Sequence, residues 1–260
     1  PRLGTIDFAG GDVVHITSGV SALVLAIVVG KRRDFGILEH RPHNVPFVLL
    51  GAGLLWFGWF GFNAGSALSA NGLAAHAFMT TATSCGAAMV SWMFIEVMQS
   101  GKPSLVGAAT GLVAGLVAIT PGAGFVPIWS AVIIGIIVSP ICYFMIAVVK
   151  KKFGYDDALD AFGCHGVGGM WGGIATGIFG LSSINDVAKW NGLCFGDTKL
   201  FVAQVISIVV TIVVAIVGTL ICLYITKLIT PIRVSKKDEL IGLDKSEHSE
   251  TAYPSFNGFD

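Results

Sequence analysis

Two histidines, His15 and His165, lie within strongly apolar stretches of the chain. An aspartate precedes each of them by less than three helical turns, at Asp7 and Asp160. Hydrocarbon makes an ionisable side chain costly, so such residues usually mark a path for an ion, a proton or a polar substrate. Imidazole suits such a path because one ring nitrogen donates while the other accepts, and its pKa lies near neutrality. Paired through one nitrogen each, the two rings would leave two nitrogens facing a narrow lumen.

The predicted helix faces around the two histidines carry small side chains. Residues three, four, seven and eight positions after a helical residue share its face. After His165 these are Gly168, Gly169, Gly172 and Gly173, and after His15 they are Ser18, Gly19, Ala22 and Leu23. Such faces let two helices approach closely, which would bring the imidazoles together. A lone histidine within the membrane is about as often a hydrogen-bond partner between helices, with a packing role only, as it is a functional residue. Two histidines with matched surroundings favour a functional role.

The composition is that of a polytopic membrane protein. Hydrophobic residues make up 54% of the 260 residues and charged residues only 12%, against about 25% in soluble domains. The formal net charge is zero, so we expect no nucleic-acid partner. The five cysteines form no CxxC pair, which argues against a zinc site or a disulfide framework, and we expect no cofactor. No Ser/His/Asp set, HExxH motif or nucleotide-binding loop is present in the sequence, so we do not expect an enzyme.

Seven apolar segments have about the 20 residues that a bilayer-spanning helix needs. They cover approximately residues 12–30, 46–70, 75–98, 104–121, 126–149, 160–181 and 200–226. Thirteen of the 16 lysines and arginines fall after the first, third and fifth segments and in the tail. By the positive-inside rule, the N-terminal end is outside and the tail is cytoplasmic. We therefore predict a membrane domain over residues 1–229 and a cytoplasmic tail over residues 230–260.

The order of the segments suggests an inverted repeat. The first and sixth segments, which carry the histidines, enter the membrane from opposite sides and stand five segments apart. Two five-helix repeats of inverted topology place their equivalent helices in this way. The chain would then contain one complete repeat, the last helix of a preceding repeat and one extra helix. The chain starts at Pro1 in an expected loop, so we expect four further helices upstream.

The aspartates near the histidines are expected to support structure. Asp160 stands where the N-cap of the sixth segment would fall, and a carboxylate there is stabilised by free N–H groups and the helix dipole. Asp7 is expected to cap or brace the loop before His15, and Asp12 is a further N-cap candidate. Asp156 and Asp157 are interpreted as loop charges.

The second segment carries an aromatic face. Trp59, Phe62 and Ser66 are spaced three and four residues apart and so share one side of a helix. An aromatic ring attracts a cation through its face, and a hydroxyl accepts a hydrogen bond from it. The face is thus a candidate cation site near the external end. The alternative is that these rings only pack in the core or face lipid.

Three motifs together resemble the ammonium transporter (Amt) branch of the Amt/Rh family. They are Asp7–His15 (DFAGGDVVH), Gly58–Ser66 (GWFGFNAGS) and Asp160–Gly166 (DAFGCHG). The resemblance runs over essentially the whole chain and includes tail residues 242–253. It implies a fragment corresponding to helices five to eleven of a fold with two inverted five-helix repeats and an extra helix.

The resemblance also implies function. It predicts a homotrimer in which each subunit takes up ammonium at an external vestibule, deprotonates it and conducts ammonia along a hydrophobic lumen in the cell membrane. At matching positions, Ser66 resembles the recruitment serine, Phe62 a gate phenylalanine and Trp59 a lumen wall residue. His15 and His165 resemble the family's twin histidines, and Asp7 its supporting aspartate. The tail of the family couples to transport and, in many prokaryotic members, to a PII-type signalling protein.

Three other classes of function are alternatives to a transporter. The first is an Amt-like ammonium sensor that signals through its tail. A seven-helix receptor of the retinal type would need a lysine in the middle of a span, but Lys227 stands at the end of its span. An intramembrane enzyme would need a nucleophile or metal set, and the sequence offers none.

Overall fold

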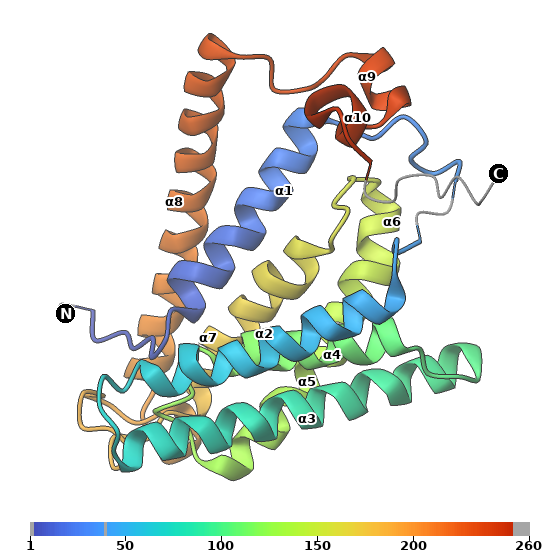
Figure 1. The fold of residues 1–260 in the computed structure, drawn as a ribbon. Helices are drawn as coiled ribbons and strands as arrows, with labels where there is room; N and C mark the ends of the chain where they lie inside the picture. Colours follow the sequence, from blue (N-terminus) through green and yellow to red (C-terminus); the bar gives the residue numbers. More distant parts are fainter. Residues whose placement is uncertain (1–2, 39–40, 252–260) are drawn as a thin grey trace.

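The computed structural model describes residues 3–38 and 41–251, and within these residues all regular structure is helical (Figure 1). A helix lies at each of the seven predicted positions. These helices are α1 (Thr17–Val29), α2 (Val45–Gly65), α3 (Gly72–Ser100), α4 (Leu105–Ile119), α5 (Ile128–Phe144), α7 (Gly168–Phe179) and α8 (Lys199–Ile229). A π-type turn precedes α1 over Gly11–Ile16, and another precedes α7 over Phe162–Val167. A third π-type turn, over Met145–Val149, and the short helix α6 (Lys150–Phe153) extend α5.

Five helices in the described part of the chain are long and apolar enough to cross a membrane. They are Gly11–Val29, Val45–Gly65, Gly72–Ser100, Ile128–Phe153 and Lys199–Ile229. Helix α4 is apolar but has only 15 residues, and the glycines and His165 lower the hydropathy of the α7 segment. The predicted second segment ends too late, because α2 stops at Gly65 and residues 66–70 form turns and bends, with Leu68 at a φ of 57°. The predicted third segment starts too late, because Asn71 caps α3 by accepting a hydrogen bond from Ala74 N and so starts that helix at Gly72.

The centre of the fold is built from α3, α4 and α5, which pack through small residues. A Cβ built on Gly111 would lie 2.5 Å from Trp92 Cβ, and one built on Gly115 would lie 2.6 Å from Ala88 Cβ. Gly135 of α5 lies so close to α3 that a Cβ there would be 2.2 Å from the Ser84 carbonyl oxygen. These glycines therefore set the helix spacing, as expected for close packing in membranes.

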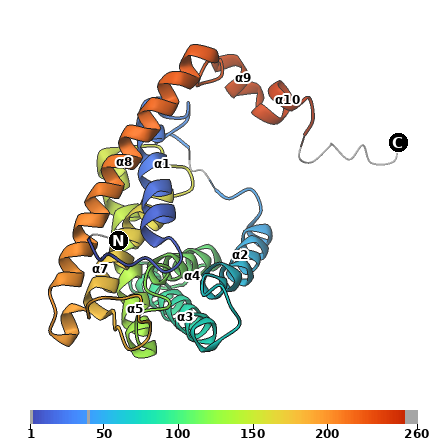
Figure 2. The same ribbon diagram turned by 90° about the vertical axis from the view of Figure 1, so that its left-hand side faces the viewer.

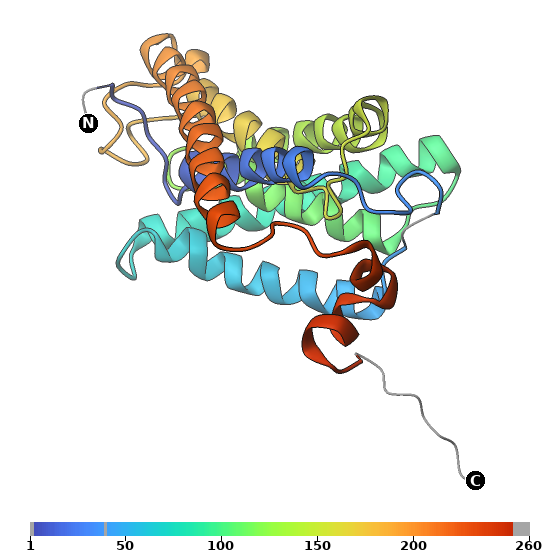
Figure 3. The same cartoon turned by 90° about the horizontal axis from the view of Figure 1, so that it is seen from above.

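Helices α1, α7 and α8 pack together at one side of this centre (Figures 1 and 2). A row of glycines spaced four residues apart lies along α7: Gly169 faces His15, Gly173 faces Asp12, and Gly177 faces Phe201 of α8. Viewed from above, α8 crosses the bundle beside α1, and the chain then turns away into the tail (Figure 3). This arrangement brings the two histidine helices into contact.

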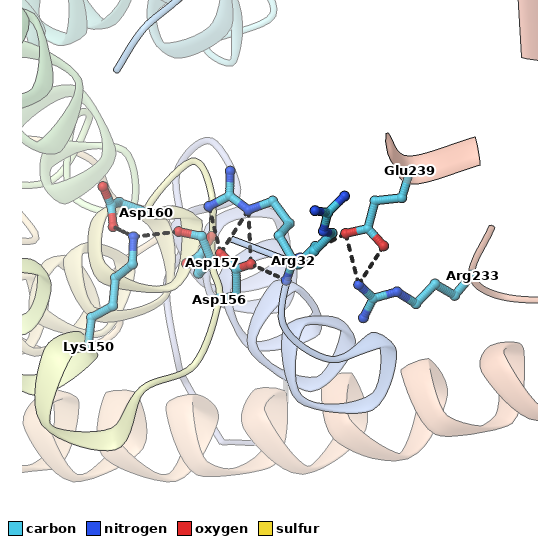
Figure 4. Close-up of polar contacts among 8 residues, drawn as sticks. Arg32, Lys150, Asp156, Asp157, Asp160, Arg233 and Glu239 are labelled. Atoms are coloured by element: carbon cyan, nitrogen blue, oxygen red, sulfur yellow. Dashed lines mark hydrogen bonds and ion pairs between the residues drawn. The ribbon is translucent and has the colours of Figure 1, made fainter. Parts of the chain in front are cut away.

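A chain of charged contacts joins the loops at one end of these helices (Figure 4). Arg32 forms a bidentate ion pair with Asp156, with Nη2 to Oδ1 at 2.6 Å, and Lys150 Nζ lies 2.6 Å from Asp160 Oδ1. The expectation that the Asp160 carboxylate caps the sixth segment was wrong. Its carbonyl accepts from Cys164 N at 2.9 Å, but its carboxylate is bound to Lys150. The capping carboxylate is that of Asp157, which accepts a hydrogen bond from Phe162 N at 2.8 Å.

Burial influences these loop groups. It raises the pKa of Asp160, although the hydrogen bond from Lys150 opposes the rise. Asp157 lies in the loop, as interpreted, but its side chain is buried. The chain reverses direction at Asp160, whose φ of 55° is rare for a residue other than glycine. This turn directs the Asp160 carboxylate to Lys150 and leaves the helix start to Asp157.

The tail folds back on the end of α1 through two short helices, α9 (Lys236–Ile241) and α10 (Leu243–His248). Arg233 Nη1 donates to the Val29 carbonyl at 3.1 Å, and Glu239 accepts from both Arg233 and the Arg33 backbone N–H. Ala252 and Tyr253, which belong to the tail resemblance, lie outside the described residues. Glu239 is thus the residue that joins the tail to the loop after α1.

Replacing Glu239 by glutamine is expected to loosen the tail. Hydrogen bonds from Arg233 lower the pKa of Glu239 below its ordinary value of 4.5. A depressed pKa means that the carboxylate stabilises the docked tail above the ordinary pKa and that this contribution is lost as the pH falls through the lowered value. Hydrogen exchange of the amides of α9 should therefore be faster in E239Q at pH 7, and wild-type protection should fall only in acid. Glu247→Gln on α10 is the matched control, and equal exchange in both variants would contradict the expectation.

Candidate functional site

The two histidine helices cross where their backbones touch. A Cβ built on Gly19 of α1 would lie 2.0 Å from the Gly166 backbone nitrogen. Gly19 lies against Gly166, and Asp12, which precedes Gly19, lies against Gly173, which follows Gly166. The residue numbers therefore increase in opposite directions along the two helices, which are antiparallel, as predicted. Each histidine also lies in a π-type turn at the start of its helix. Such turns are rare in proteins as a whole, but those that occur are often found at functional sites.

The imidazoles of His15 and His165 meet at this crossing. Their Nδ1 atoms are 3.3 Å apart and the ring centroids 5.3 Å apart. His15 is 3% exposed, while His165 is half-buried. The Trp59 ring stacks on His15 at 5.2 Å with an interplanar angle of 16°, and Phe62 meets His15 edge-on at 5.9 Å. The structure therefore brings four of the predicted pore residues together.

Thr120, at the end of α4, holds this cluster from the other side. Its hydroxyl donates to the Leu116 carbonyl at 2.7 Å and accepts from Trp59 Nε1 at 3.0 Å. His15 Nε2 lies 3.3 Å from the same oxygen. Because the single hydroxyl hydrogen is used on Leu116, a hydrogen bond here requires His15 Nε2 to carry a proton. A neutral His15 then has a bare Nδ1, and the bond within the pair runs from His165 Nδ1–H to His15 Nδ1. Both nitrogens of His15 are thus engaged, so the prediction that each ring leaves one nitrogen facing the lumen was wrong for His15.

Replacing Thr120 by valine is expected to destabilise the protein by about 1–3 kcal/mol, because Trp59 Nε1 and His15 Nε2 would both lose a buried partner. The melting temperature in detergent would report this change. Thr110→Val is the control, since the Thr110 hydroxyl lies on the same helix and bonds to the Val106 carbonyl. Equal melting temperatures of the two variants would show that the Thr120 contacts carry no stability.

Ser66 lies one helical turn beyond Phe62, at the end of α2. Its hydroxyl donates to the Phe62 carbonyl at 2.8 Å and its side chain is half-buried. Trp59, Phe62 and Ser66 thus follow one face of α2, with Trp59 and Phe62 against His15 and Ser66 farther along. The oxygen of Ser66 keeps its lone pairs, so the hydroxyl can still accept a hydrogen bond from a cation.

Asp7 organises the start of α1. Its carboxylate accepts from the N–H groups of Gly10, Gly11 and Asp12 at 3.1, 2.6 and 3.0 Å, with a longer contact to Val13. Burial raises the pKa of Asp7, while these N–H groups oppose the rise. Asp7 therefore satisfies helix N–H groups that otherwise lack partners, and this arrangement fixes the turn that contains His15.

Asp12 was predicted as an N-cap candidate, and this was wrong. It lies inside the first turn and is 1% exposed. Its carboxylate faces Gly173 of α7 and Ser207 of α8, and neither oxygen makes a hydrogen bond of good geometry within residues 3–38 and 41–251. The capping role belongs to Asp7 alone.

The structure leaves Asp160 outside the cluster, at the loop end of the α7 segment with Lys150. Sequence reasoning missed Thr120, whose partners His15 and Trp59 are 105 and 61 residues away in the chain. A threonine after an apolar helix carries no local signal of such contacts. Among the described residues, no group of three or more His, Cys, Asp and Glu side chains could hold a metal ion.

Comparison with known proteins identifies the family. The profile of the Ammonium Transporter Family matches residues 2–253. This chain belongs to that family. It is 49% identical over 252 residues to an ammonium transporter of Bacillus subtilis, covering 97% of this chain and 62% of that protein. It is 48% identical to an ammonium transporter of Aquifex aeolicus, covering 96% and 57% of the two chains.

Solved structures of family members show the same fold. The crystal structure of Saccharomyces cerevisiae Mep2 matches with a TM-score of 0.83 and 37% identity, covering 91% of this chain and 55% of that one. A structure titled "Sensor Amt Protein" matches with a TM-score of 0.84 and 31% identity, covering 95% of this chain and 61% of that one.

The predictions of an all-α multi-pass membrane protein and of the ammonium-transporter fold are confirmed. The family is one of transporters rather than of enzymes. The chain spans about three fifths of the length of the curated relatives that it matches.

Proposed function

We propose that this chain forms part of an ammonium transporter and that His15 and His165 line its pore as a hydrogen-bonded pair. The observation that carries the proposal is the 3.3 Å contact of the two Nδ1 atoms inside an apolar membrane domain. The names of the relatives support ammonium as substrate. Because the chain spans only part of these relatives, the activity is proposed for the complete protein.

The chemistry of the pore follows from the cost of desolvation. A bare ammonium ion would lose its hydration in an apolar lumen, which is far more costly than the transfer of neutral ammonia. In the proposed mechanism, NH4+ gives one proton to water or to the histidine pair and crosses the lumen as NH3. The proton can move separately along the hydrogen bond between the two imidazoles, because imidazole can accept a proton at one nitrogen and release one from the other. To release its proton, His15 Nε2 would have to break its bond to Thr120.

The external end of α2 is proposed as the recruitment site. Ser66 would accept a hydrogen bond from NH4+, and Phe62 would separate this site from the lumen as a gate. Trp59 would form the lumen wall beside His15. The stacking of Trp59 on His15 and the edge contact of Phe62 support this assignment. Asp7 and Asp160 are proposed as structural supports that fix the two histidine helices.

The family resemblance leads to three further proposals for the complete protein. It is a homotrimer in the cell membrane, its tail after residue 229 is cytoplasmic, and a PII-type signalling protein binds at the cytoplasmic face. The lysines and arginines after the odd-numbered predicted segments support the orientation of the tail.

A sensor is the second candidate function. The similarity to a protein titled as a sensor Amt and the docking of the tail on the end of α1 favour it. The two functions differ in whether they depend on uptake of the substrate. A sensor would keep signalling through its tail when uptake is lost, whereas a transporter is defined by the uptake itself.

Uptake of radiolabelled methylammonium by proteoliposomes tests the proposal. The complete protein, with the part that this chain does not cover, is reconstituted and compared with protein-free vesicles. We expect faster uptake with the protein and competition by unlabelled ammonium. Uptake at the rate of protein-free vesicles would overturn the transporter proposal and leave the sensor.

A further inference from the structure

Asp12 carries a buried carboxyl group that the proposed pore does not use. It lies in the π-type turn before α1, where this segment packs against α7 and α8, and it is only 1% exposed. A Cβ built on Gly173 of α7 would lie 2.8 Å from Asp12 Oδ1 and 3.0 Å from Ile208 Cδ1 of α8. The carboxyl group is therefore enclosed by the bare backbone of one helix and an apolar side chain of another.

No cation faces this carboxyl group from the described helices that pack against it. Helix α7 has no ionisable residue over Gly168–Phe179, and α8 has none over residues 200–221. On its own segment, the neighbouring titratable groups are Asp7, which is a second acid, and His15, whose ring is engaged at both nitrogens. An ionised Asp12 would thus be an unpaired negative charge beside another acid, which is strongly unfavourable in a dry interior.

The polar neighbour of Asp12 on α8 is the Ser207 hydroxyl group. Neither oxygen of Asp12 accepts a hydrogen bond of good geometry from a donor within residues 3–38 and 41–251. A carboxylate can only accept hydrogen bonds, whereas a protonated carboxyl group also donates one. With a proton on Asp12, the new O–H group can donate to the Ser207 oxygen, and the carboxyl group no longer needs donors on both of its oxygens.

We propose that Asp12 binds a proton at neutral pH and, as a neutral carboxylic acid, donates a hydrogen bond to Ser207 that joins the α1 segment to α8. The proton removes the unpaired charge and supplies the donor that this junction lacks. It also keeps a fixed negative charge away from the histidine pair, since Asp12 stands three residues before His15. The site is separate from the pore and does not depend on ammonium transport.

Infrared spectroscopy of the purified complete protein tests the protonation of Asp12. A protonated carboxylic acid has a carbonyl stretching band that an ionised carboxylate lacks. We expect Asp12→Asn at pH 7 to reduce the area of this band by the contribution of one carboxyl group. Asp186→Asn, which removes an exposed carboxyl group from the loop between α7 and α8, is the control and should leave the band unchanged. A band of equal area in Asp12→Asn and the unaltered protein would show that Asp12 is ionised and would overturn the proposal.

A second variant tests the hydrogen bond without changing Asp12. Ser207→Ala removes the acceptor, so the Asp12 band should move to higher frequency, as it does when a carboxyl group loses a hydrogen bond. Thr219→Val is the matched control, because Thr219 also lies on α8 but bonds to Ser21 of α1 at 2.7 Å. An Asp12 band at the same frequency in Ser207→Ala and Thr219→Val would exclude Ser207 as the partner and overturn the proposed contact.

Thermal unfolding measures the same proton independently. The unfolded chain releases it above the ordinary value for aspartate, about 3.9, while the folded protein keeps it. The folded state then binds more protons, so this group lowers the stability as the pH rises. The melting temperature of Asp12→Asn relative to the unaltered protein should therefore rise by at least about 2 °C from pH 5 to pH 8, and that of Asp186→Asn should not. A constant difference for Asp12→Asn would contradict the bound proton, whereas absent methylammonium uptake would overturn the transporter proposal alone.

Discussion

Replacing both His15 and His165 by alanine in the complete protein is expected to lower methylammonium uptake at least about 100-fold, to the level of protein-free vesicles. The physical reason is the loss of every polar atom that the pair offers in the lumen. The aromatic side chains of Trp59 and Phe62 would remain around an empty, apolar space with no group to accept or release a proton. Passage of a polar substrate through such a space is costly.

A variant of a third histidine controls for unspecific effects of the double replacement. His76 of α3 bonds to the Val126 carbonyl at 2.9 Å and takes no part in the pair, so His76→Ala should retain uptake. Elution of each variant as a single species in size-exclusion chromatography would show that it folds. Normal uptake by a folded His15→Ala, His165→Ala protein would exclude a role of the pair in conduction.

Replacing Gly19 by valine is expected to destabilise the membrane domain by at least about 3 kcal/mol, the upper end of the usual cost of overpacking. A Cβ at this position would lie 2.0 Å from the Gly166 nitrogen and 2.4 Å from its Cα. Both atoms belong to the backbone, so no side chain can move aside and the helices themselves must separate. The separation would also break the contact between His15 and His165, which lies one turn away. The melting temperature measured by tryptophan fluorescence would report the change.

Gly53→Val provides the matched comparison for Gly19→Val. A Cβ on Gly53 of α2 meets no atom within 4 Å, so this variant pays the same helix-propensity cost without a clash. We expect its melting temperature to stay close to that of the unaltered protein. If Gly19→Val melted at the same temperature as Gly53→Val, the backbone contact of α1 with the α7 segment would be disproved.

Much of the fold could be predicted from the sequence because its signals are local. Apolar runs of about 20 residues mark membrane helices wherever they pack. The small residues on the faces of His15 and His165 indicated a close approach, and Gly19 and Gly166 are where it occurs. The seven helix positions and the antiparallel histidine helices followed from these patterns and from the distribution of positive charge.

The capping of the His15 turn by Asp7 was predicted from the sequence, but the other supporting contacts could not be predicted in this way. The sequence suggests Asp160 as a cap, but the chain reverses at that residue and Asp157 takes the role. The π-type turns that hold both histidines have no recognised sequence pattern, and Asp12 resembles a cap in sequence although it is buried within the turn. These outcomes depend on backbone geometry at single residues, which neighbouring residue types constrain only weakly.

By itself, the sequence determined that this is an all-α membrane protein with two histidines on small helix faces, since hydrophobicity and side-chain size act at each position along the chain. Only the tertiary structure decided which atoms meet. It placed the two Nδ1 atoms 3.3 Å apart, set Thr120 against His15 and Trp59, and brought Arg233 and Lys236 to the end of α1. Hydrogen bonds and charge pairs of this kind form over a few ångströms between residues far apart in the chain, so their partners are selected by helix packing and not by sequence spacing.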